Sequence, residues 1–255
     1  MKNLSVFVLF LFCLTFTLNG QVTTSGISGK VTAEGELLIG ATVQAVHEPS
    51  GTTYGTVTNA DGRYSLQGMR TGGPYTVEVS YVGFQKAVYK NITLQLGETY
   101  LLDVKLTESL SLDEVVVTAS KAALFNSQKT GAAQNFNQSQ IQATPSVSRS
   151  IFDVTKMNPL GVNTASGMSF AGSSNKYNSF QIDGITNNDV FGLSSSGTNG
   201  GQAGANPISL EAIEEIQVVI APYDVRQGGF TGGGINAITK SGTNTFHGSA
   251  YWYYN

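Results

Sequence analysis

The residues whose types and spacing could support catalysis lie in the second half of the chain. Ser173 and Lys176 are spaced as in the S-x-x-K motif of serine acyl-enzymes, and Lys129-Thr130-Gly131 matches their K-T-G motif. The two motifs occur in inverted order, and no helical pattern presents Ser173. Because short motifs recur by chance, we expect no catalytic residue here and no enzymatic activity.

Residues that could bind a metal, a phosphate or a cofactor are also sparse. His47 and His247 have no acidic or cysteine neighbours at metal-ligand spacing, so we interpret both as surface histidines. The glycines of 228–234 lack the βαβ frame of a dinucleotide-binding loop and favour packed turns. The sequence therefore predicts neither a metal site nor a cofactor.

Three glutamates stand close together near the end of the chain. Glu211, Glu214 and Glu215 fit a helix end and its solvent-exposed face, because nothing places a second acid opposite them. We therefore do not interpret them as a catalytic pair.

Composition narrows the class of protein. Charged residues make up 12% of the 255 residues, the net charge is −3 and the sequence pI is about 5.4, which argues against a nucleic-acid partner. The hydrophobic content of 40% and the 30 glycines are typical of β-rich, loop-rich structure.

Residues 1–20 have the pattern of a secretory signal peptide. Lys2 supplies the positive start, the run from 6 to 14 is entirely apolar, and Gly20 precedes a plausible cleavage point. Cys13 is the only cysteine and lies inside the apolar run, so we expect a mature chain without disulfides.

Residues 26–106 alternate between apolar and polar types, as short β-strands do. Tyr75, Val77 and Val79 point to one face of such a strand, and the turn at 59–62 is a strong hairpin signal. About seven strands at this spacing predict a small β-sandwich.

The stretch from 112 to 120 contains three consecutive valines, which favour a strand. It follows a polar tether at 107–111. Such a strand can pair with the sheet edge of another protein, or it can close the preceding domain.

The rest of the chain mixes helices and strands around a long polar loop. Ser209 is a plausible N-cap, and the loop from Asn187 to Asn206 is long enough to be functional or mobile. The region from Lys121 to Gln142 is weakly patterned. We expect a short helix near 145–157, another from Leu210, and strands at Gly161–Phe170, Ser179–Ile182, Ile216–Ile220 and Ile235–Thr239.

Two resemblances refine this outline, and the first covers about 80 residues. Gly29-Lys30-Val31-Thr32, Leu38-Ile39-Gly40-Ala41-Thr42-Val43 and Thr58-Asn59-Ala60-Asp61-Gly62-Arg63-Tyr64 look like a carboxypeptidase regulatory-like domain. That family has a transthyretin-like sandwich fold and is not a peptidase, so the resemblance implies no catalysis.

The second resemblance runs from about 112 to the last residue. Phe180-Gln181-Ile182-Asp183-Gly184, Ile213-Glu214-Glu215-Ile216-Gln217-Val218 and Gly232-Gly233-Gly234-Ile235-Asn236 resemble the plug domain of TonB-dependent outer-membrane receptors, closest to the Oar-like branch. This resemblance implies that the valine stretch is a TonB box, with partner-binding residues Asp113, Glu114, Val115, Val116, Val117, Thr118 and Ala119. It also implies substrate contacts from Asn187, Asn188, Asp189 and Phe191 in the plug loop.

Together these features predict a mainly β protein: a small transthyretin-like β-sandwich, an α+β plug domain, and the first strand of an outer-membrane β-barrel whose remainder is missing. The expected boundaries are 1–20 for the signal peptide, 21–107 for the sandwich, 108–120 for the linker with the TonB box, 121–243 for the plug and 244–255 for the barrel start.

The predicted function is that of an N-terminal fragment of a TonB-dependent receptor. In the whole receptor the plug would gate substrate uptake driven by TonB. The expected partners are the TonB C-terminal domain, the outer membrane through the barrel, and a transported substrate that the sequence does not identify. We expect the outer membrane of a Gram-negative bacterium, with the sandwich and the TonB box on its periplasmic side. The alternative is a secreted binding or adhesive module built on the sandwich.

Overall fold

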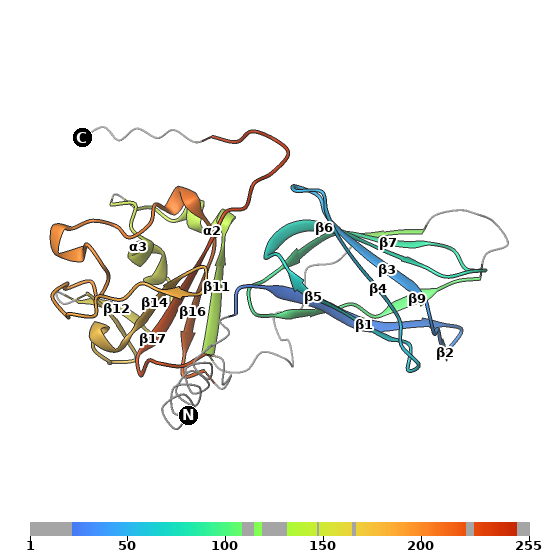
Figure 1. Cartoon of the computed structure of the whole chain (residues 1–255), viewed down its shortest axis with the longest axis horizontal. Coiled ribbons are helices and arrows are strands. Elements are labelled where there is room, and N and C mark those ends of the chain that lie inside the picture. The colour runs from blue at the N-terminus through green and yellow to red at the C-terminus, as the bar shows by residue number, and fades with distance from the viewer. Residues whose placement is uncertain are drawn as a thin grey trace, which may run out of the picture.

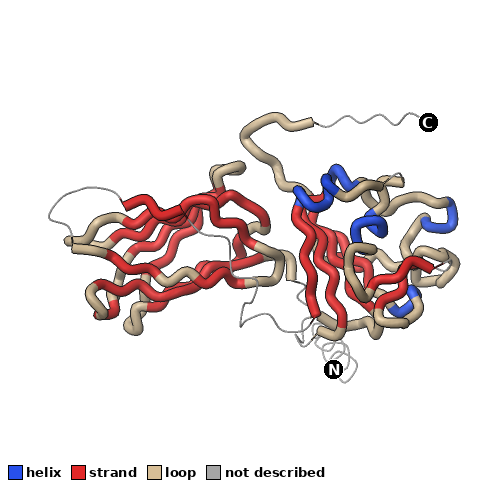
Figure 2. Tube along the Cα trace, turned by 180° about the vertical axis from the view of Figure 1, so that it is seen from behind, coloured by secondary structure: helices blue, strands red, loops and turns tan. Residues whose placement is uncertain are grey.

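The computed structural model of the protein describes residues 22–108, 115–118, 132–146, 148–164, 167–222 and 227–248. These residues form two β-rich bodies that lie side by side (Figures 1 and 2). The predicted signal peptide, with Cys13, lies outside the described residues. In the described part of the chain, no helix is both long and apolar enough to cross a membrane.

The first body spans residues 22–108 and consists of two packed sheets. Its strands are β1 (Ser25–Ala33), β2 (Glu36–Leu37), β3 (Thr42–His47), β4 (Thr52–Val57), β5 (Arg63–Met69), β6 (Gly72–Ser80), β7 (Ala87–Leu94), β8 (Thr99–Leu101) and β9 (Val104–Leu106). One sheet has the order β2-β1-β5, with β8 and β9 paired to β1. The other has the order β7-β6-β3-β4, and it is extended beyond β7 by β10 (Val115–Thr118).

The core of the first body lies between these sheets, where the apolar face of each strand points inward. Ile27 and Val31 of β1 and Val77 and Val79 of β6 are all 0% exposed. Burial on alternate positions is what a strand with one solvated face requires. The predicted small β-sandwich is therefore present.

The turn at 59–62 connects β4 to β5 and is held by local polar contacts. The side-chain oxygen of Asn59 accepts hydrogen bonds from the backbone N–H groups of Asp61 and Arg63, at 3.0 and 2.9 Å. Gly62 has a φ of 64°, a conformation that costs glycine nothing. The predicted turn is present, but the predicted hairpin was wrong: β4 pairs with β3 and β5 pairs with β1, so the turn links the two sheets.

The second body is an α+β unit built on one sheet. Its strands and helices are β11 (Ala132–Asn137), α2 (Gln138–Ala143), α3 (Ile151–Thr155), β12 (Gly161–Thr164), β13 (Gly167–Phe170), η2 (Asn175–Tyr177), β14 (Ser179–Ile182), β15 (Ile185–Thr186), η3 (Gly201–Ala203), η4 (Leu210–Ala212), β16 (Ile213–Ile220) and β17 (Gly233–Thr239). The sheet order is β11-β16-β17-β14-β15, and β12 with β13 forms a separate hairpin. Phe136, Phe170, Ile213, Ile216 and Ile235 contribute to its core.

Two expectations for this body were wrong in detail. The single strand expected at Gly161–Phe170 is an antiparallel hairpin, in which Gly161 pairs with Phe170. The weakly patterned region before residue 142 contains β11 and α2. Asn137 caps α2 by accepting from the Gln140 backbone N–H at 3.0 Å, and the Gln140 side chain accepts from the Asn137 N–H at 3.0 Å. This capping box was visible in the sequence as an asparagine three residues before a glutamine.

The segment after β17 was predicted to begin a barrel strand at 244–255. Residues 244–248 form no strand, and the rest of the predicted strand lies outside the described residues. Asn244 instead contacts the first body, where its backbone N–H donates to the Pro49 carbonyl at 3.0 Å.

Candidate functional site

The segment predicted as a TonB box is represented by β10. Its four residues pair in parallel with β7, with Val115 opposite Ala87, Val116 opposite Val88, and Thr118 opposite Lys90. The extended conformation agrees with the predicted strand. The pairing itself is what the alternative expects, namely a strand that completes the preceding domain. Asp113, Glu114 and Ala119 lie outside the described residues.

Strand β10 ends its sheet, so β7 occupies only one of its two edges. A strand at the end of a sheet presents backbone N–H and C=O groups outward, and these groups can pair with another chain. Among the described residues, no strand pairs with this second edge.

The predicted substrate-contacting loop follows β15, and its polar side chains bind the loop itself. Asn188 accepts from the Phe180 N–H at 2.7 Å and donates to the Asn178 carbonyl at 3.2 Å. The Asn187 side chain accepts from Asn199 at 2.7 Å. These amides fix the path of the loop and connect it to β14.

Asp189 also stabilises the loop from within. Its carboxylate accepts from the backbone N–H groups of Ser194 and Phe191. These hydrogen bonds, the one from Ser194 foremost, lower the pKa of Asp189 below its usual range, because they favour the charged form.

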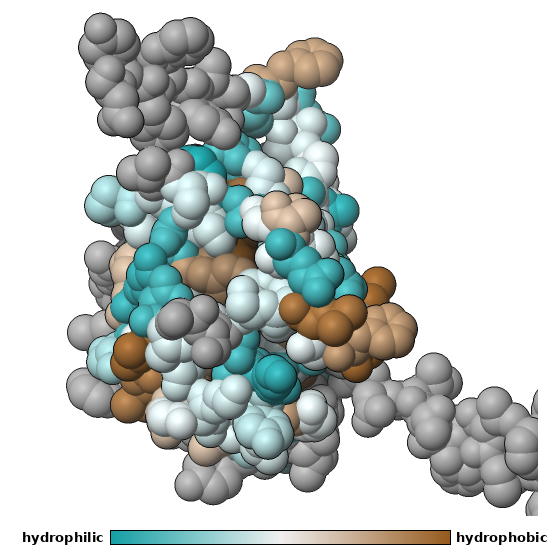
Figure 3. Space-filling view, turned by 90° about the vertical axis from the view of Figure 1, so that its left-hand side faces the viewer, coloured by the Kyte–Doolittle hydropathy of each residue, from teal (hydrophilic) through white to brown (hydrophobic). Residues whose placement is uncertain are grey.

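Apolar side chains project from the same loop. Val190, Phe191 and Leu193 are 83%, 81% and 65% exposed. The face of the second body in Figure 3 is mostly hydrophilic, with separate brown apolar patches. Of the four predicted loop residues, Phe191 is exposed, whereas Asn187, Asn188 and Asp189 are half-buried.

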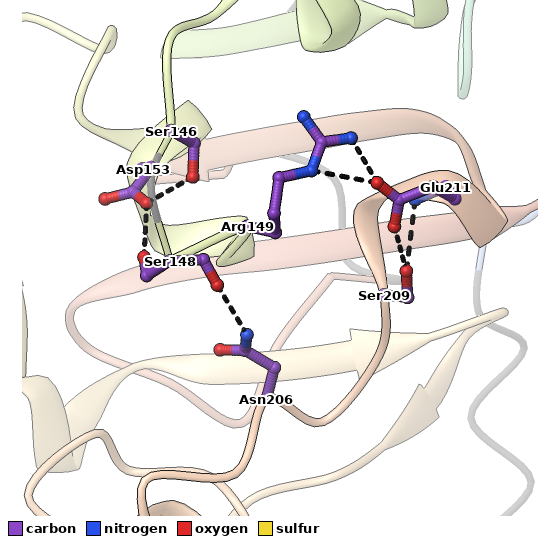
Figure 4. Close-up of polar contacts among 7 residues, drawn as sticks. All are labelled: Ser146, Ser148, Arg149, Asp153, Asn206, Ser209 and Glu211. Carbon is purple, nitrogen blue, oxygen red and sulfur yellow. Dashed lines mark hydrogen bonds and ion pairs between the residues drawn. The ribbon is translucent and has the colours of Figure 1, made fainter. Parts of the chain in front are cut away.

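A polar network holds the entry to α3 against the turn before β16 (Figure 4). Arg149 forms an ion pair with Glu211, through its Nε at 2.8 Å and its Nη2, and the hydroxyl of Ser209 donates to the same carboxylate. Asn206 donates to the backbone carbonyl of Ser148 at 3.1 Å. All of these contacts join residues of the second body to one another, so they explain its geometry and indicate no catalytic role.

Asp153 is the acidic group of this network on α3. Burial opposes its ionisation. Hydrogen bonds from Lys156, Ser146 and Ser148 outweigh burial and lower the pKa of Asp153 to about 2. Asp153 is therefore a charged structural residue and not a proton donor at neutral pH.

The residues weighed for catalysis or metal binding do not assemble a site. Among the described residues, no group of three or more histidine, cysteine or acidic side chains could hold a metal ion. The glycines expected to form packed turns divide into two groups: a Cβ on Gly228 or Gly229 would meet nothing within 4 Å, whereas Gly233 and Gly234 lie on β17, where a Cβ would come within 2.4 Å of the Phe170 ring and 2.8 Å of the Phe230 ring.

The interpretation of His47 as a surface residue was wrong. Its side chain is 7% exposed, its ring centroid lies 4.8 Å from that of Tyr75, and Nδ1 is 2.7 Å from the Ser50 hydroxyl. Burial, together with the charge of Arg70, lowers the pKa of His47. A histidine on a strand whose residues alternate between buried and exposed can lie on the inner face, and here the Ser50 hydroxyl forms a hydrogen bond with the ring nitrogen.

The interpretation of Glu215 as a solvent-facing helix residue was also wrong. Glu215 lies on β16 and is 3% exposed. Its carboxylate faces the first body, where both oxygens accept from the backbone N–H of Leu96 at 3.1 Å. Sequence reasoning missed this residue because its partner lies more than a hundred positions away.

Comparisons with known proteins agree with this architecture. Residues 26–107 match the carboxypeptidase regulatory-like domain family. Over 204 residues the chain is 29% identical to the TonB-dependent transporter Oar of Myxococcus xanthus, and the aligned region covers 76% of this chain and 18% of that protein. Over 131 residues it is 34% identical to the TonB-dependent receptor P26 of Formosa agariphila, which covers 50% of this chain and 12% of that protein.

Solved structures add little. The wild-type catechol 1,2-dioxygenase of Acinetobacter radioresistens is 14% identical, covers 38% of this chain and 58% of its own, and has a TM-score of 0.28. A likeness this slight carries no argument about function.

The chain spans less than a fifth of the length of either curated relative. On the domain match and these two relatives, the chain is identified as similar to the N-terminal part of an Oar-like TonB-dependent receptor, with a carboxypeptidase regulatory-like domain at residues 26–107.

Proposed function

We propose that this chain gates substrate uptake across the outer membrane in a TonB-dependent receptor. The TonB C-terminal domain would bind residues 113–119 and transmit force to the plug at 121–243. The regulatory-like domain and the TonB box would lie on the periplasmic side. Both curated relatives are named TonB-dependent, and the whole receptor's transport activity is carried over from them as part of this proposal.

The observation that best supports the proposal is the position of β10. It is extended and lies at the end of its sheet, with one edge turned away from β7. Pairing by strand addition needs this geometry, because affinity comes from main-chain hydrogen bonds. An already extended strand also loses less conformational entropy when its partner binds.

The second body fits the role of the plug because it is a folded α+β unit that follows the box in sequence. Its long loop would contact the transported substrate through Phe191, which is exposed. Asn187, Asn188 and Asp189 would hold the loop in shape through the hydrogen bonds described above. The relatives' names do not give the substrate.

Calorimetry with a TonB C-terminal domain tests the proposal. Val116→Pro removes one backbone donor and fixes φ, so it should abolish binding. The matched variant Val116→Thr keeps the donor and the strand propensity, so it should bind as the wild type does. Equal binding by both variants would show that the box assignment is wrong.

A further inference from the structure

One residue of the regulatory-like domain, Leu96, is held by the plug through both its backbone N–H and its backbone carbonyl. Leu96 lies in the loop between β7 and β8, and its side chain is 0% exposed. Its N–H donates to both carboxylate oxygens of Glu215, and its carbonyl accepts from Gln217 at 2.8 Å and from Asn135 at 3.2 Å. Gln217 also donates to Asn135 at 3.2 Å. The three plug side chains thus form one connected socket for Leu96.

The socket places an acid where water does not reach it. Glu215 is 3% exposed, and none of the described ion pairs includes it. A buried carboxylate without a cation is costly and depends on the hydrogen bonds that it accepts. Here the bonds come from Leu96, so the contact between the two bodies and the charge state of Glu215 are linked.

The neighbouring charges act in the same direction as burial. Burial raises the pKa of Glu215 to about 7, and the nearby carboxylates of Glu98 and Glu214 add to this effect. The hydrogen bonds from Leu96 and Asn135 oppose it. Lys240, which follows β17, acts on Glu214, whose own pKa is raised by burial. Burial and the two neighbouring carboxylates outweigh these hydrogen bonds, so the protonated form of Glu215 is favoured.

We propose that the contact between Leu96 and Glu215 is a proton-dependent latch that docks the regulatory-like domain on the plug. This inference rests on the proposed gating function and adds a means of regulating it. The docked carboxyl keeps its proton to a higher pH than an exposed one would. Docking is therefore strongest below pH 4.5, the value for an exposed carboxyl, and weakens as the pH rises to about 7.

The latch is connected through β7 to the strand that carries the predicted TonB box. Strand β7 pairs with β10 along Ala87 to Lys90 and ends at Leu94, two residues before the latch residue Leu96. When β10 is pulled, a latched domain would move together with the plug. A released domain would move separately, so the protonation of Glu215 would decide which parts bear the force.

Fluorescence energy transfer between the two bodies measures docking directly. We would attach dyes to the exposed positions Lys30→Cys and Lys176→Cys in the full chain carrying Cys13→Ser. From about pH 4 to about pH 8, the wild type should lose up to about a hundredfold in its docking constant. Glu215→Gln keeps an acceptor for Leu96 but cannot titrate, so its docking should not change with pH.

The matched control is Glu214→Gln, which removes a neighbouring charge and leaves the acceptor for Leu96 in place. It should keep the pH response. A pH response of Glu215→Gln equal to that of the wild type would overturn the latch.

A second measurement does not depend on any variant folding. Carbon-13 NMR of the wild-type chain should show Glu215 titrating near pH 7, and a midpoint near 4.5 would overturn the proposal. Neither measurement needs TonB, so a failure of TonB to bind would count against the proposed function and not against the latch.

Discussion

The hydroxyl of Tyr64 donates a hydrogen bond of 2.7 Å to the backbone carbonyl of Leu102. The bond crosses over β1, where Gly29 leaves room for it: a Cβ on Gly29 would lie 1.9 Å from that carbonyl oxygen. Glycine at 29 and tyrosine at 64 both belong to the pattern by which the sequence resembles the regulatory-like family. The structure gives a physical reason for each.

Removing the Tyr64 hydroxyl should destabilise the sandwich. Tyr64→Phe leaves the Leu102 carbonyl without this buried partner, which costs about 1–3 kcal/mol. Gly29→Ala should be worse, because the backbone of β1 or of Leu102 must move. Denaturant unfolding of the full chain measures both, and a Gly29→Ala variant as stable as the wild type would contradict the close approach.

Asp183 should anchor the turn between β14 and β15 to β17. Its carboxylate accepts from the backbone N–H and the hydroxyl of Thr239, each at 2.8 Å, while its own φ is 50°. Asp183→Ala loses both bonds and disfavours the positive φ, so it should cost about 1–3 kcal/mol. Asp183→Asn keeps an acceptor and tolerates the turn, so it should cost less. A thermal melt compares the two, and equal losses would argue against the role of these bonds.

Lowering the pH should destabilise the fold around α3, because Asp153 becomes protonated. Its pKa is lowered from 3.8 in the unfolded chain to about 2 in the fold. The stabilisation is therefore fully present above pH 3.8 and is lost as the pH falls toward 2. Asp153→Asn should lower the melting temperature by a few degrees at pH 7 and make it less sensitive to acid. Identical acid profiles for the variant and the wild type would refute this.

The loop residue Phe191 should matter for contacts and not for folding. Phe191 is 81% exposed, so Phe191→Ala should change the free energy of unfolding by less than about 0.5 kcal/mol. The contrasting variant is Phe170→Ala, at a position that is 0% exposed, which should cost about 3–5 kcal/mol. A large loss of stability from Phe191→Ala would mean that this side chain packs against the protein.

Local chemistry explains which parts of the fold could be predicted. The turn at Asn59 and the inner face of β6 depend on neighbouring residues and on strand alternation, so the sequence shows them, whereas the sheets to which β4 and β5 belong are set by distant strands. The 3-10 helix η4 begins after Ser209, whose hydroxyl caps it, where a helix was expected. Strand β16 (Ile213–Ile220) contains the strand expected at Ile216–Ile220, although its first residues were taken for a helix end.

Long-range contacts explain what could not be predicted. Glu215 looks like a surface residue until the loop that carries Leu96 covers it. The pairing of β10 with β7 likewise depends on chain segments that the local pattern does not relate. For the loop from Asn187 to Asn206, the residue types indicated a functional loop, but only the structure separates the hydrogen-bonded amides from the exposed Phe191.

The TonB-box assignment is tested most simply by hydrogen exchange of residues 113–119 in the full chain, with and without a TonB C-terminal domain. Because β10 has an outer edge that no described strand covers, we expect TonB to slow exchange across this segment. The loop from Asn187 to Asn206 should exchange at the same rate in both samples. If TonB binds while the exchange rates of residues 113–119 stay the same, the segment is not the TonB box and the proposed function is wrong in this respect.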